Sequence, residues 1–274
     1  MLSTTIIVTT YNWPDALRLS LCSILEQSIK PDQVIVADDG SGPDTTKAVE
    51  DILTPSNLRW YHVWHQDKGV RQSRIKNLAV KYSDLPYLIF VDQDVILHPN
   101  FVEDHLSMAQ EGIFLQGKRS LLPGYYTKKV LADGTFKPPP PWMRGLKNRK
   151  NTFRSSVLKR FFARPRKFQT SLRGCNLSMF KSDFLKVDGF DETFDQSWGR
   201  EDSDICYRMF HCGMRIRTLW FSALQYHLQH EVIKNWERER LDSQIQQNLK
   251  EKREKALKGF SQLTSEGEIV GASS

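Results

Sequence analysis

Two carboxylates separated by one residue follow an apolar run in the first half of the chain. The motif is Asp92-Gln93-Asp94, and the run before it is Leu88-Ile89-Phe90-Val91. One carboxylate of such a pair can bond the ribose of a nucleotide diphosphate. The other can ligate a divalent ion that bridges the phosphates, and Mg²⁺ and Mn²⁺ prefer such oxygen ligands. An acidic surface turn is the alternative, but the position directly after a buried strand favours the nucleotide site.

Two further groups in this half could contact a nucleotide. Asp38-Asp39-Gly40-Ser41 also follows an apolar run, and a carboxylate there can accept a hydrogen bond from the ring N–H of a uracil. An Asx-type turn at Gly40 is the structural alternative, and both can hold at once. Arg71 lies in the first turn of a predicted helix, where a guanidinium could contact a pyrophosphate. Most helical Arg and Lys side chains are solvated, which is the alternative for Arg71, and Arg74 and Lys76 are its neighbours on the same helix.

The second half offers groups suited to a sugar and to a metal ion. Trp198 precedes the adjacent acids Glu201 and Asp202 at a predicted helix start. An indole gives a pyranose ring an apolar face, and a carboxylate can take a hydroxyl proton. The helix dipole alone would also favour the acids, but it does not explain Trp198. His227 and His230 follow at i and i+3, and we expect one of them to bind the metal ion.

An α/β fold is needed to bring these groups together. Strands are expected at 4–9, 33–37, 58–63 and 87–91, with helices at 15–27, 44–53 and 70–81 between them. Alternation of this kind predicts a parallel sheet with crossover helices, in which ligands bind beyond the carboxyl ends of the strands. Tyr11, Asp39 and Asp92 all lie at such ends.

Order after residue 121 is less regular. A four-proline run at 138–141 and a basic stretch interrupt the pattern. Helices are expected at 182–187, with Ser182 as N-cap, and at 201–212. A charged helical tail is expected from residue 231, with 267–274 frayed.

Composition and charge narrow the class of protein. The chain has 274 residues, 39% of them hydrophobic, which suits one α/β domain. No apolar run reaches the roughly 18 residues of a membrane span, and the first residues lack the basic flank of a signal peptide. Four cysteines without a CxxC pair fit a reducing compartment, so a cytoplasmic location is expected.

The positive charge is concentrated in one segment. Residues 128–167 hold thirteen Lys and Arg and one acid, a charge of +12, whereas the whole chain carries +7 and the remainder therefore −5. That asymmetry argues against nucleic-acid binding by the body of the protein and favours contact of one patch with an anionic surface. The stretch 157–164 mixes aromatic and basic residues, which suits an anionic membrane, and a disordered lid over the site is the alternative.

Together these motifs resemble family 2 glycosyltransferases of the GT-A fold. The first half is similar at Thr9-Thr10-Tyr11-Asn12, at 38–41, at Gly69-Val70-Arg71 and at 92–94. The second half looks like a galactosyltransferase-type C-terminal motif, from Gly174-Cys175-Asn176 through Gly189-Phe190-Asp191 to 198–204. Similar segments occur in bacterial chondroitin polymerase and in β1,4-galactosyltransferases. The resemblance covers residues 3 to about 231.

The resemblance implies a role for each matching residue. Thr9, Tyr11 and Asp39 would hold the uridine, Asp92 the ribose and Asp94 the metal ion, Mn²⁺ or Mg²⁺. Asp202 would be the catalytic base and Glu201 its partner in the acceptor site, with Trp198 against the sugar. His227 fits the third metal contact by spacing, and His230 is the alternative. Arg200 departs from the family because Gly usually stands there, and 138–167 has no recognised counterpart.

The expected protein is thus an inverting glycosyltransferase that moves a hexose or N-acetylhexosamine from a UDP-sugar to a saccharide or glycolipid acceptor. Lipopolysaccharide or capsule synthesis at the inner membrane face is the expected context, by association. The expected organisation is a GT-A domain over 1–231 and a tail over 232–274. Within the domain, 1–121 binds the nucleotide-sugar, 122–170 is the basic insertion and 171–231 carries the acceptor half. A nucleotidyltransferase and a non-catalytic sugar-nucleotide-binding protein are the alternatives.

Overall fold

Strands and helices alternate through the first 92 residues of the computed structural model, which describes residues 2–170, 172–231, 237–264 and 267–273. The elements are β1 (Thr4–Thr10), α1 (Pro14–Leu25), β2 (Gln33–Asp38), α2 (Pro43–Leu53), β3 (Arg59–Trp64), α3 (Gln72–Tyr82) and β4 (Tyr87–Asp92). Proline stands at the start of α1 and α2, where its missing N–H has no partner to lose. The sequence prediction of these strands and helices is confirmed, with boundaries that differ by at most two residues.

The remaining elements are shorter and less regular. They are β5 (Val95–Leu97), α4 (Phe101–Leu106), β6 (Ile113–Gln116), β7 (Arg119–Leu121), α5 (Gly124–Asp133), η1 (Arg149–Thr152), α6 (Ser156–Phe162), β8 (Pro165–Arg166), β9 (Asn176–Phe180), α7 (Lys181–Lys186), η2 (Glu192–Phe194), α8 (Glu201–His211), β10 (Arg215–Thr218), β11 (Gln225–His227), α9 (Arg238–Lys250), η3 (Phe260–Gln262) and β12 (Glu268–Ala272). The prediction that Ser182 caps α7 was wrong, because the helix begins at Lys181 after Phe180.

One large mixed sheet runs through the molecule. Its strand order is β12-β3-β2-β1-β4-β9-β6-β10-β8, and β3, β2, β1 and β4 are mutually parallel. β9 runs antiparallel to both β4 and β6 and connects the parallel strands to β6, β10 and β8. A second sheet, β5-β11-β7, lies beside the end of β4. Because β4 and β5 are joined by two residues, Gln93 and Asp94 lie between the two sheets.

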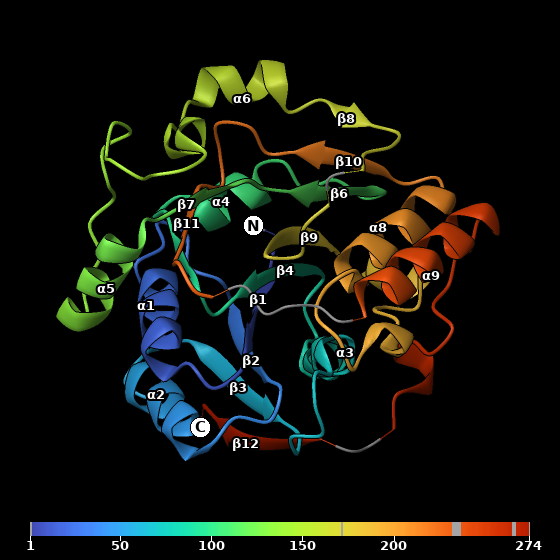
Figure 1. Cartoon of the computed structure of the whole chain (residues 1–274), viewed down its shortest axis with the longest axis horizontal. Coiled ribbons are helices and arrows are strands. Elements are labelled where there is room, and N and C mark those ends of the chain that lie inside the picture. The colour runs from blue at the N-terminus through green and yellow to red at the C-terminus, as the bar shows by residue number, and fades with distance from the viewer. Residues whose placement is uncertain (1, 171, 232–236, 265–266, 274) are drawn as a thin grey trace.

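Helices cover both faces of the large sheet. Ile6 and Val8 of β1 belong to the apolar cluster that contains Leu17 of α1 and Val49 of α2. Ile7, between them, belongs to the opposite cluster, which α3, α8 and α9 complete. Alternate strand residues therefore face alternate helical layers, and Figure 1 shows α1 and α2 on one side of the sheet and α3, α8 and α9 on the other.

The C-terminal residues belong to the same packed body. Leu241 and Ile245 of α9 join the cluster of α8, and β12 pairs antiparallel with β3 at one edge of the large sheet. The prediction of a frayed end at 267–274 was therefore wrong for residues 267–273. The predicted helix also ends earlier, at Lys250. Within the described residues, 237–264 and 267–273 pack on the domain rather than extend from it.

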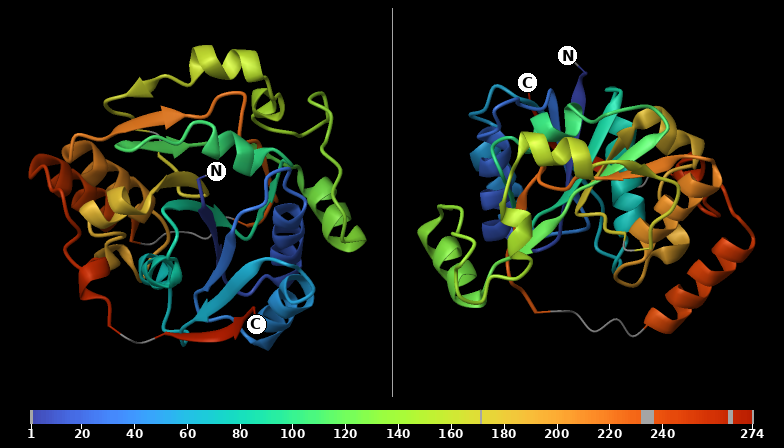
Figure 2. Two further views of the ribbon diagram at one scale, coloured as in Figure 1. Left: turned by 180° about the vertical axis from the view of Figure 1, so that it is seen from behind. Right: turned by 90° about the horizontal axis from the view of Figure 1, so that it is seen from above.

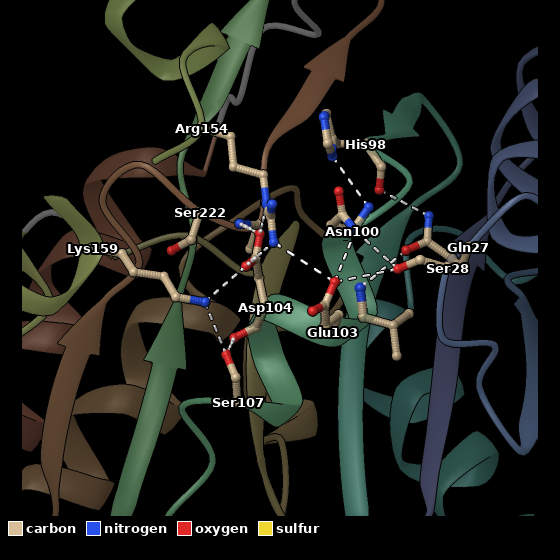
Figure 3. Close-up of polar contacts among 12 residues, drawn as sticks. Gln27, Ser28, His98, Asn100, Glu103, Asp104, Ser107, Arg154, Lys159 and Ser222 are labelled. Carbon is tan, nitrogen blue, oxygen red and sulfur yellow. Dashed lines mark hydrogen bonds and ion pairs between the residues drawn. The ribbon is translucent and has the colours of Figure 1, made fainter. Parts of the chain in front are cut away.

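The basic segment is ordered along the opposite edge. β8 pairs with β10, and Figure 2 shows α6 and β8 on the side of the molecule away from β12. Buried Asp104 anchors the segment, because its carboxylate accepts two bonds from Arg154, at 2.8 and 2.9 Å, and one from Lys159 at 3.1 Å. Figure 3 shows both cations pointing at this carboxylate. The segment is therefore ordered, which contradicts the disorder in the lid alternative, whereas a lid function for it stays a prediction.

Of the helices in the described ranges, none combines the length and the apolar character needed to cross a bilayer.

Candidate active site

The candidate site lies at the carboxyl ends of β1, β2 and β4, as the sequence predicts for a parallel sheet. Gln93 links the ends of β1 and β4. Its side-chain oxygen Oε1 accepts from Thr10 Oγ1 at 2.5 Å and from the Tyr11 N–H at 3.1 Å. Its side-chain nitrogen Nε2 donates to the Tyr11 carbonyl at 3.0 Å. The central residue of the Asp-Gln-Asp motif thus fixes the loop that carries Tyr11. No feature of the motif in the sequence indicates this positioning role.

Asp39 is buried at the end of β2 and already has two partners. Its oxygens accept from His65 Nε2, at 2.7 Å if that nitrogen carries the proton, and from the Arg71 N–H at 2.9 Å. Asp38 forms the Asx-type turn that was the alternative, because its carboxylate accepts from the Ser41 N–H at 2.8 Å. Gly40 has φ +98°, and a side chain there would meet the backbone of Asp67. The turn is therefore compact. Because each Asp39 oxygen already has one partner, a uracil N–H would have to be accepted by a remaining lone pair.

A cleft lies next to this turn. It is lined by Trp64, His65, Gln66, Lys68, Arg71, Gly267 and Glu268. The Arg71 guanidinium bonds the Gln66 carbonyl, and the Tyr11 hydroxyl bonds Asp67 at 3.0 Å across the same loop. Thr9 is buried, and its hydroxyl has no partner among the described residues. Thr9, Tyr11, Asp39 and Arg71 thus lie at one end of the sheet, and their contacts with a nucleotide stay a prediction.

The predicted metal ligand Asp94 lies beside both histidines that were the alternatives for a further ligand. Asp94 Oδ2 is 3.2 Å from His227 Nε2 and 3.0 Å from His230 Nε2, and the ligand atoms of all three lie within 4.8 Å of one another. His227 Nδ1 lies 2.7 Å from the Leu228 carbonyl oxygen, and His230 Nδ1 lies 2.8 Å from the Glu231 carbonyl oxygen. Each Nδ1–H can donate to its carbonyl, which leaves a lone pair on Nε2 for the ion. The other Asp94 oxygen is buried without a partner. This donor set fits a divalent ion, and it includes both histidines rather than one.

The two imidazoles have opposite protonation tendencies. Burial lowers the pKa of His227, although the Asp94 carboxylate opposes it. The hydrogen bond to Asp94 raises the pKa of the more exposed His230, against burial. A neutral imidazole is the form that binds a metal ion. The shift of His227 is therefore toward the neutral form that ligates, whereas the shift of His230 is toward the protonated form.

A second, strongly polar cavity lies between the two halves of the domain. It is lined by Gln72, Lys76, Asp92, Arg119, Arg173, Gly174, Cys175, Glu201 and Asp202. Buried Lys76 of α3 bonds Glu201 at the start of α8 at 3.0 Å. Burial raises the pKa of Asp92 to about 7, with Lys76 opposing the shift and Asp94 adding to it. The cavity thus joins the Asp-Gln-Asp motif to the acidic pair of the second half.

Asp202 lies in this cavity with its carboxylate held by the backbone. Oδ2 accepts from the Gly174 N–H at 2.8 Å, and Oδ1 accepts from the Ser203 N–H at 2.6 Å. Burial first, and then the neighbouring Glu201 carboxylate, raise the pKa of Asp202 to about 6, against the effect of Lys76. A carboxylate with such a pKa is ionised at neutral pH and is still a stronger base than a solvated one, as general-base catalysis requires.

The residues before α8 form a loop of unusual backbone geometry. Gly199 and Arg200 have φ values of +88° and +81°, a region in which glycine is favoured. The Arg200 guanidinium pairs with Asp242 of α9, so this side chain is turned toward the C-terminal helix. Trp198 is half-buried and does not line the cavity that contains Glu201 and Asp202. Its contact with a sugar stays a prediction.

Three cations of the cavity were missed or misread from the sequence. Lys76 was placed among helical residues that are mostly solvated, yet it is 3% exposed and paired with Glu201. Arg119 and Arg173 had no signal, because neither belongs to a motif. Spacing could have placed Lys76 on the inner face of α3 with Gln72, but its acidic partner is 125 residues away in the sequence.

The chain matches two family models. The model of glycosyl transferase family 2 matches residues 5–167, and the model described as the N-terminal domain of galactosyltransferase matches residues 158–231. Because the first covers more than half of the chain, the chain belongs to glycosyl transferase family 2. The resemblance seen in the sequence motifs is thereby confirmed.

Characterised proteins show the same relationship at low identity. Validoxylamine A glucosyltransferase of Streptomyces hygroscopicus is 26% identical, over 83% of this chain and 52% of its own length. Chondroitin synthase of Escherichia coli is 23% identical, over 81% of this chain and 34% of its own. The chain therefore spans about half, or less, of the length of these relatives.

Solved structures confirm the fold. The crystal structure of residues 1–349 of TarS from S. aureus superposes with a TM-score of 0.57 at 18% identity, over 82% of this chain and 60% of that one. The prediction of an α/β domain of the GT-A fold with helices on both faces of the sheet is confirmed at this level. The sheet is mixed rather than mostly parallel, because four of its eight strand pairings within the described residues are antiparallel.

Proposed function

We propose that this family 2 chain transfers a hexose or N-acetylhexosamine from a UDP-sugar to a hydroxyl of a saccharide acceptor, with inversion at the anomeric carbon. The observation that carries the proposal is the position of the Asp-Gln-Asp motif. Asp94 lies with His227 and His230, and Asp92 lines the cavity that contains Asp202. TarS has crystal structures in complex with UDP and with UDP-GlcNAc, which supports the choice of donor.

One set of site residues binds the UDP-sugar donor and another binds the acceptor. Thr9, Tyr11, Asp39 and Arg71 bind the uridine and pyrophosphate, and Asp92 bonds the ribose. Asp202 Oδ takes the proton of the acceptor hydroxyl while that oxygen forms a bond to the anomeric carbon. The bond from this carbon to the diphosphate oxygen breaks, and its electron pair leaves with UDP. Trp198 and Glu201 position the acceptor.

Asp94, His227 and His230 would hold a divalent ion, and two imidazoles beside one carboxylate favour Mn²⁺ over Mg²⁺. Such an ion supplies positive charge that offsets the charge developing on the diphosphate. The Arg119 guanidinium supplies further positive charge near the diphosphate. It lines the same cavity as Asp92, and it is close enough to lower the pKa of both histidines.

Metal-dependent binding of UDP tests the proposal. Calorimetry should detect UDP binding that strengthens with Mn²⁺, and a panel of UDP-sugars should include one that the protein hydrolyses slowly. Asp94→Asn should abolish the Mn²⁺ dependence and nearly abolish turnover, because the amide cannot replace the anionic ligand. Asp133→Asn, at an exposed acid of α5, is the matched control. Unchanged Mn²⁺ dependence in Asp94→Asn would remove Asp94 from the metal site.

The acceptor is proposed to be a saccharide or glycolipid of cell-surface polysaccharide or lipopolysaccharide synthesis, met at the cytoplasmic face of the membrane. The outer face of α6 supports this, because Val157, Phe161 and Phe162 are 54–62% exposed beside exposed Arg160 and Arg164. Apolar and basic residues together suit the interface of an anionic bilayer.

A further inference from the structure

Cations gather beside the catalytic cavity and continue past it. Arg119 and Arg173 line the cavity with Asp202, and Lys118 directly precedes Arg119. Burial lowers the pKa of Lys118, and the positive charges of Arg173, Lys150 and Arg166 lower it further, in that order. We define the cationic strip as Lys118, Lys150, Arg166 and Arg173. It combines residues from the loop before β7, from η1, from β8 and from the loop before β9.

An aromatic ring, rather than an acid, holds two members of the cationic strip. Lys118 Nζ lies 4.9 Å and Lys150 Nζ lies 5.0 Å from the ring centroid of Trp220. An indole attracts an ammonium group without neutralising its charge. Among the described residues, none of the four strip side chains forms an ion pair with a carboxylate. The ring therefore holds the two ammonium groups without supplying a counter-charge.

Other cations of the same region behave differently. Arg154 and Lys159 both pair with buried Asp104, and Arg154 also lies 3.7 Å from Glu103, so these cations anchor the basic segment. Arg173 reaches the acidic cavity, whereas Lys118 and Lys150 meet at the Trp220 ring without an ion pair to an acid among the described residues. Like charges held this close oppose one another, which disfavours the free state. An anionic ligand that binds between them would relieve this repulsion. The strip thus has the charge of a binding site, whereas the Arg154–Asp104–Lys159 cluster has that of a structural one.

The donor does not need these charges. Its diphosphate is placed beside Asp94, the histidines and Arg119, while Lys118, Lys150 and Arg166 lie outside the cavity that contains Asp92. Arg173 connects the two regions, because it lines the cavity and is next to Gly174, whose N–H bonds Asp202. A ligand that extends from the cavity to the strip would therefore pass next to Asp202, the proposed catalytic base.

We propose that the cationic strip binds an anionic group, a carboxylate or a phosphate, of the acceptor saccharide whose hydroxyl Asp202 deprotonates. This inference rests on the proposed glycosyl transfer and narrows its acceptor to an acidic saccharide. Arg173 contacts the anionic group nearest the reacting hydroxyl, and Lys118, Lys150 and Arg166 contact groups further along the same chain.

Direct binding of saccharide probes tests the inference without turnover. The probes are tetragalacturonate for the carboxylate, glucose 6-phosphate for the phosphate and maltotetraose as the neutral saccharide, each titrated by calorimetry at low and high salt. One charged probe should bind at least tenfold more tightly than maltotetraose, and salt should weaken it. Lys150→Gln and Arg173→Gln should each weaken that probe about tenfold, since a charged hydrogen bond is lost. Arg173→Lys should recover part of the affinity.

The controls separate the strip from its surroundings and from the proposed function. Arg144→Gln changes an exposed cation of the same basic segment and should leave probe binding unchanged. UDP binding with Mn²⁺, measured on the same samples, reports on the donor site alone. If UDP binds and hydrolysis proceeds but the charged probes bind no better than maltotetraose, the strip inference fails and the proposed function stands. If UDP does not bind, the proposed function fails instead.

Three other outcomes would overturn the inference. Inorganic phosphate that competes as well as glucose 6-phosphate would reveal a small-anion site. A loss of UDP affinity in Arg173→Gln, with probe binding intact, would transfer this cation to the donor diphosphate. Strip variants that lose binding to anionic vesicles but retain binding to both charged probes would assign the strip to the membrane.

Discussion

Asp202 is the residue whose proposed chemistry depends most on its surroundings. Two backbone N–H groups fix its carboxylate, and burial keeps it more basic than a solvated aspartate. Asp202→Asn should retain UDP binding and lose transfer by roughly 10²–10⁴-fold, since the amide cannot accept the hydroxyl proton. Calorimetry with UDP and a transfer assay measure the two effects separately. Transfer above about a third of the normal rate would show that Asp202 is not the base.

Lys76 should control the pH at which that base works. With a pKa of about 6, Asp202 loses activity as the pH falls through 6, because the protonated acid cannot accept a proton. Lys76 opposes the rise in this pKa, so Lys76→Met should move the acid limb of the kcat profile to higher pH. Profiles are recorded at saturating donor, so that titration of Asp92 in the free enzyme does not contribute. Lys81→Met, an exposed lysine of the same helix, is the control, and an unshifted limb in Lys76→Met would contradict the coupling.

Residue types at strand ends were readable from the sequence, but buried charge was not. Asp92, Asp94 and the two histidines were found because motif and position agree. Lys76 was placed among mostly solvated residues because lysine in an amphipathic helix is usually exposed. Its burial depends on α8 bringing Glu201 against α3, a tertiary contact that no local pattern reports. Arg173 was missed for the same reason.

At the scale of elements, Asp104 of α4 should determine whether the basic segment stays docked. Burial would raise its pKa, but the bonds from Arg154, the Ala223 N–H and Lys159 lower it overall. Its contribution to stability is therefore present above the unfolded pKa of about 4 and is lost as the pH falls through the lower folded value. Asp104→Asn removes the anion that both cations share, and it should speed proteolysis within residues 134–170.

Limited proteolysis with mapping of the cleavage sites measures this effect at neutral pH. The parallel half of the sheet should stay resistant, because its strands β3, β2, β1 and β4 lie on the far side of β9 from β8. Asp133→Asn should digest like the unaltered protein. Equal cleavage rates in Asp104→Asn and the control would mean that contacts such as Phe162 on Phe221 hold the segment without Asp104.

Helices and strands were predictable where the spacing of apolar residues follows one period, as in the first half, in which strands and helices alternate. The C-terminal strand was not, because residues 267–274 are rich in Gly and Ser and look frayed by composition. β12 exists because β3 offers an unpaired edge about two hundred residues earlier in the chain. Arg200 shows the same limit, since its positive φ is visible only in the folded loop, where its side chain pairs with α9.

For the whole molecule, the distribution of charge separates two surfaces of one basic segment. The segment carries +12 against −5 elsewhere, yet Arg154 and Lys159 pair with Asp104, and Lys150 and Arg166 belong to the cationic strip. The outward cations on and after α6 remain, namely Arg160, Arg164 and Lys167, with Phe161 and Phe162 exposed between them. These five residues form the surface that is expected to meet a bilayer.

Vesicles rich in anionic lipid should therefore bind the protein, and salt should release it, because exposed charges are screened beyond a Debye length of about 8–10 Å. Each cation that reaches the surface contributes about 1 kcal/mol, so the three outward cations give about 3 kcal/mol, and the two phenylalanines add apolar burial. Replacing Arg160, Arg164 and Lys167 by Gln and both phenylalanines by Ser should leave the protein in the supernatant on co-sedimentation. The same number of charges removed at Lys30, Lys47 and Lys81, exposed elsewhere, should change little. Equal recovery of all variants with anionic and neutral vesicles would contradict the membrane contact, and the face of α6 would then have to serve the acceptor alone.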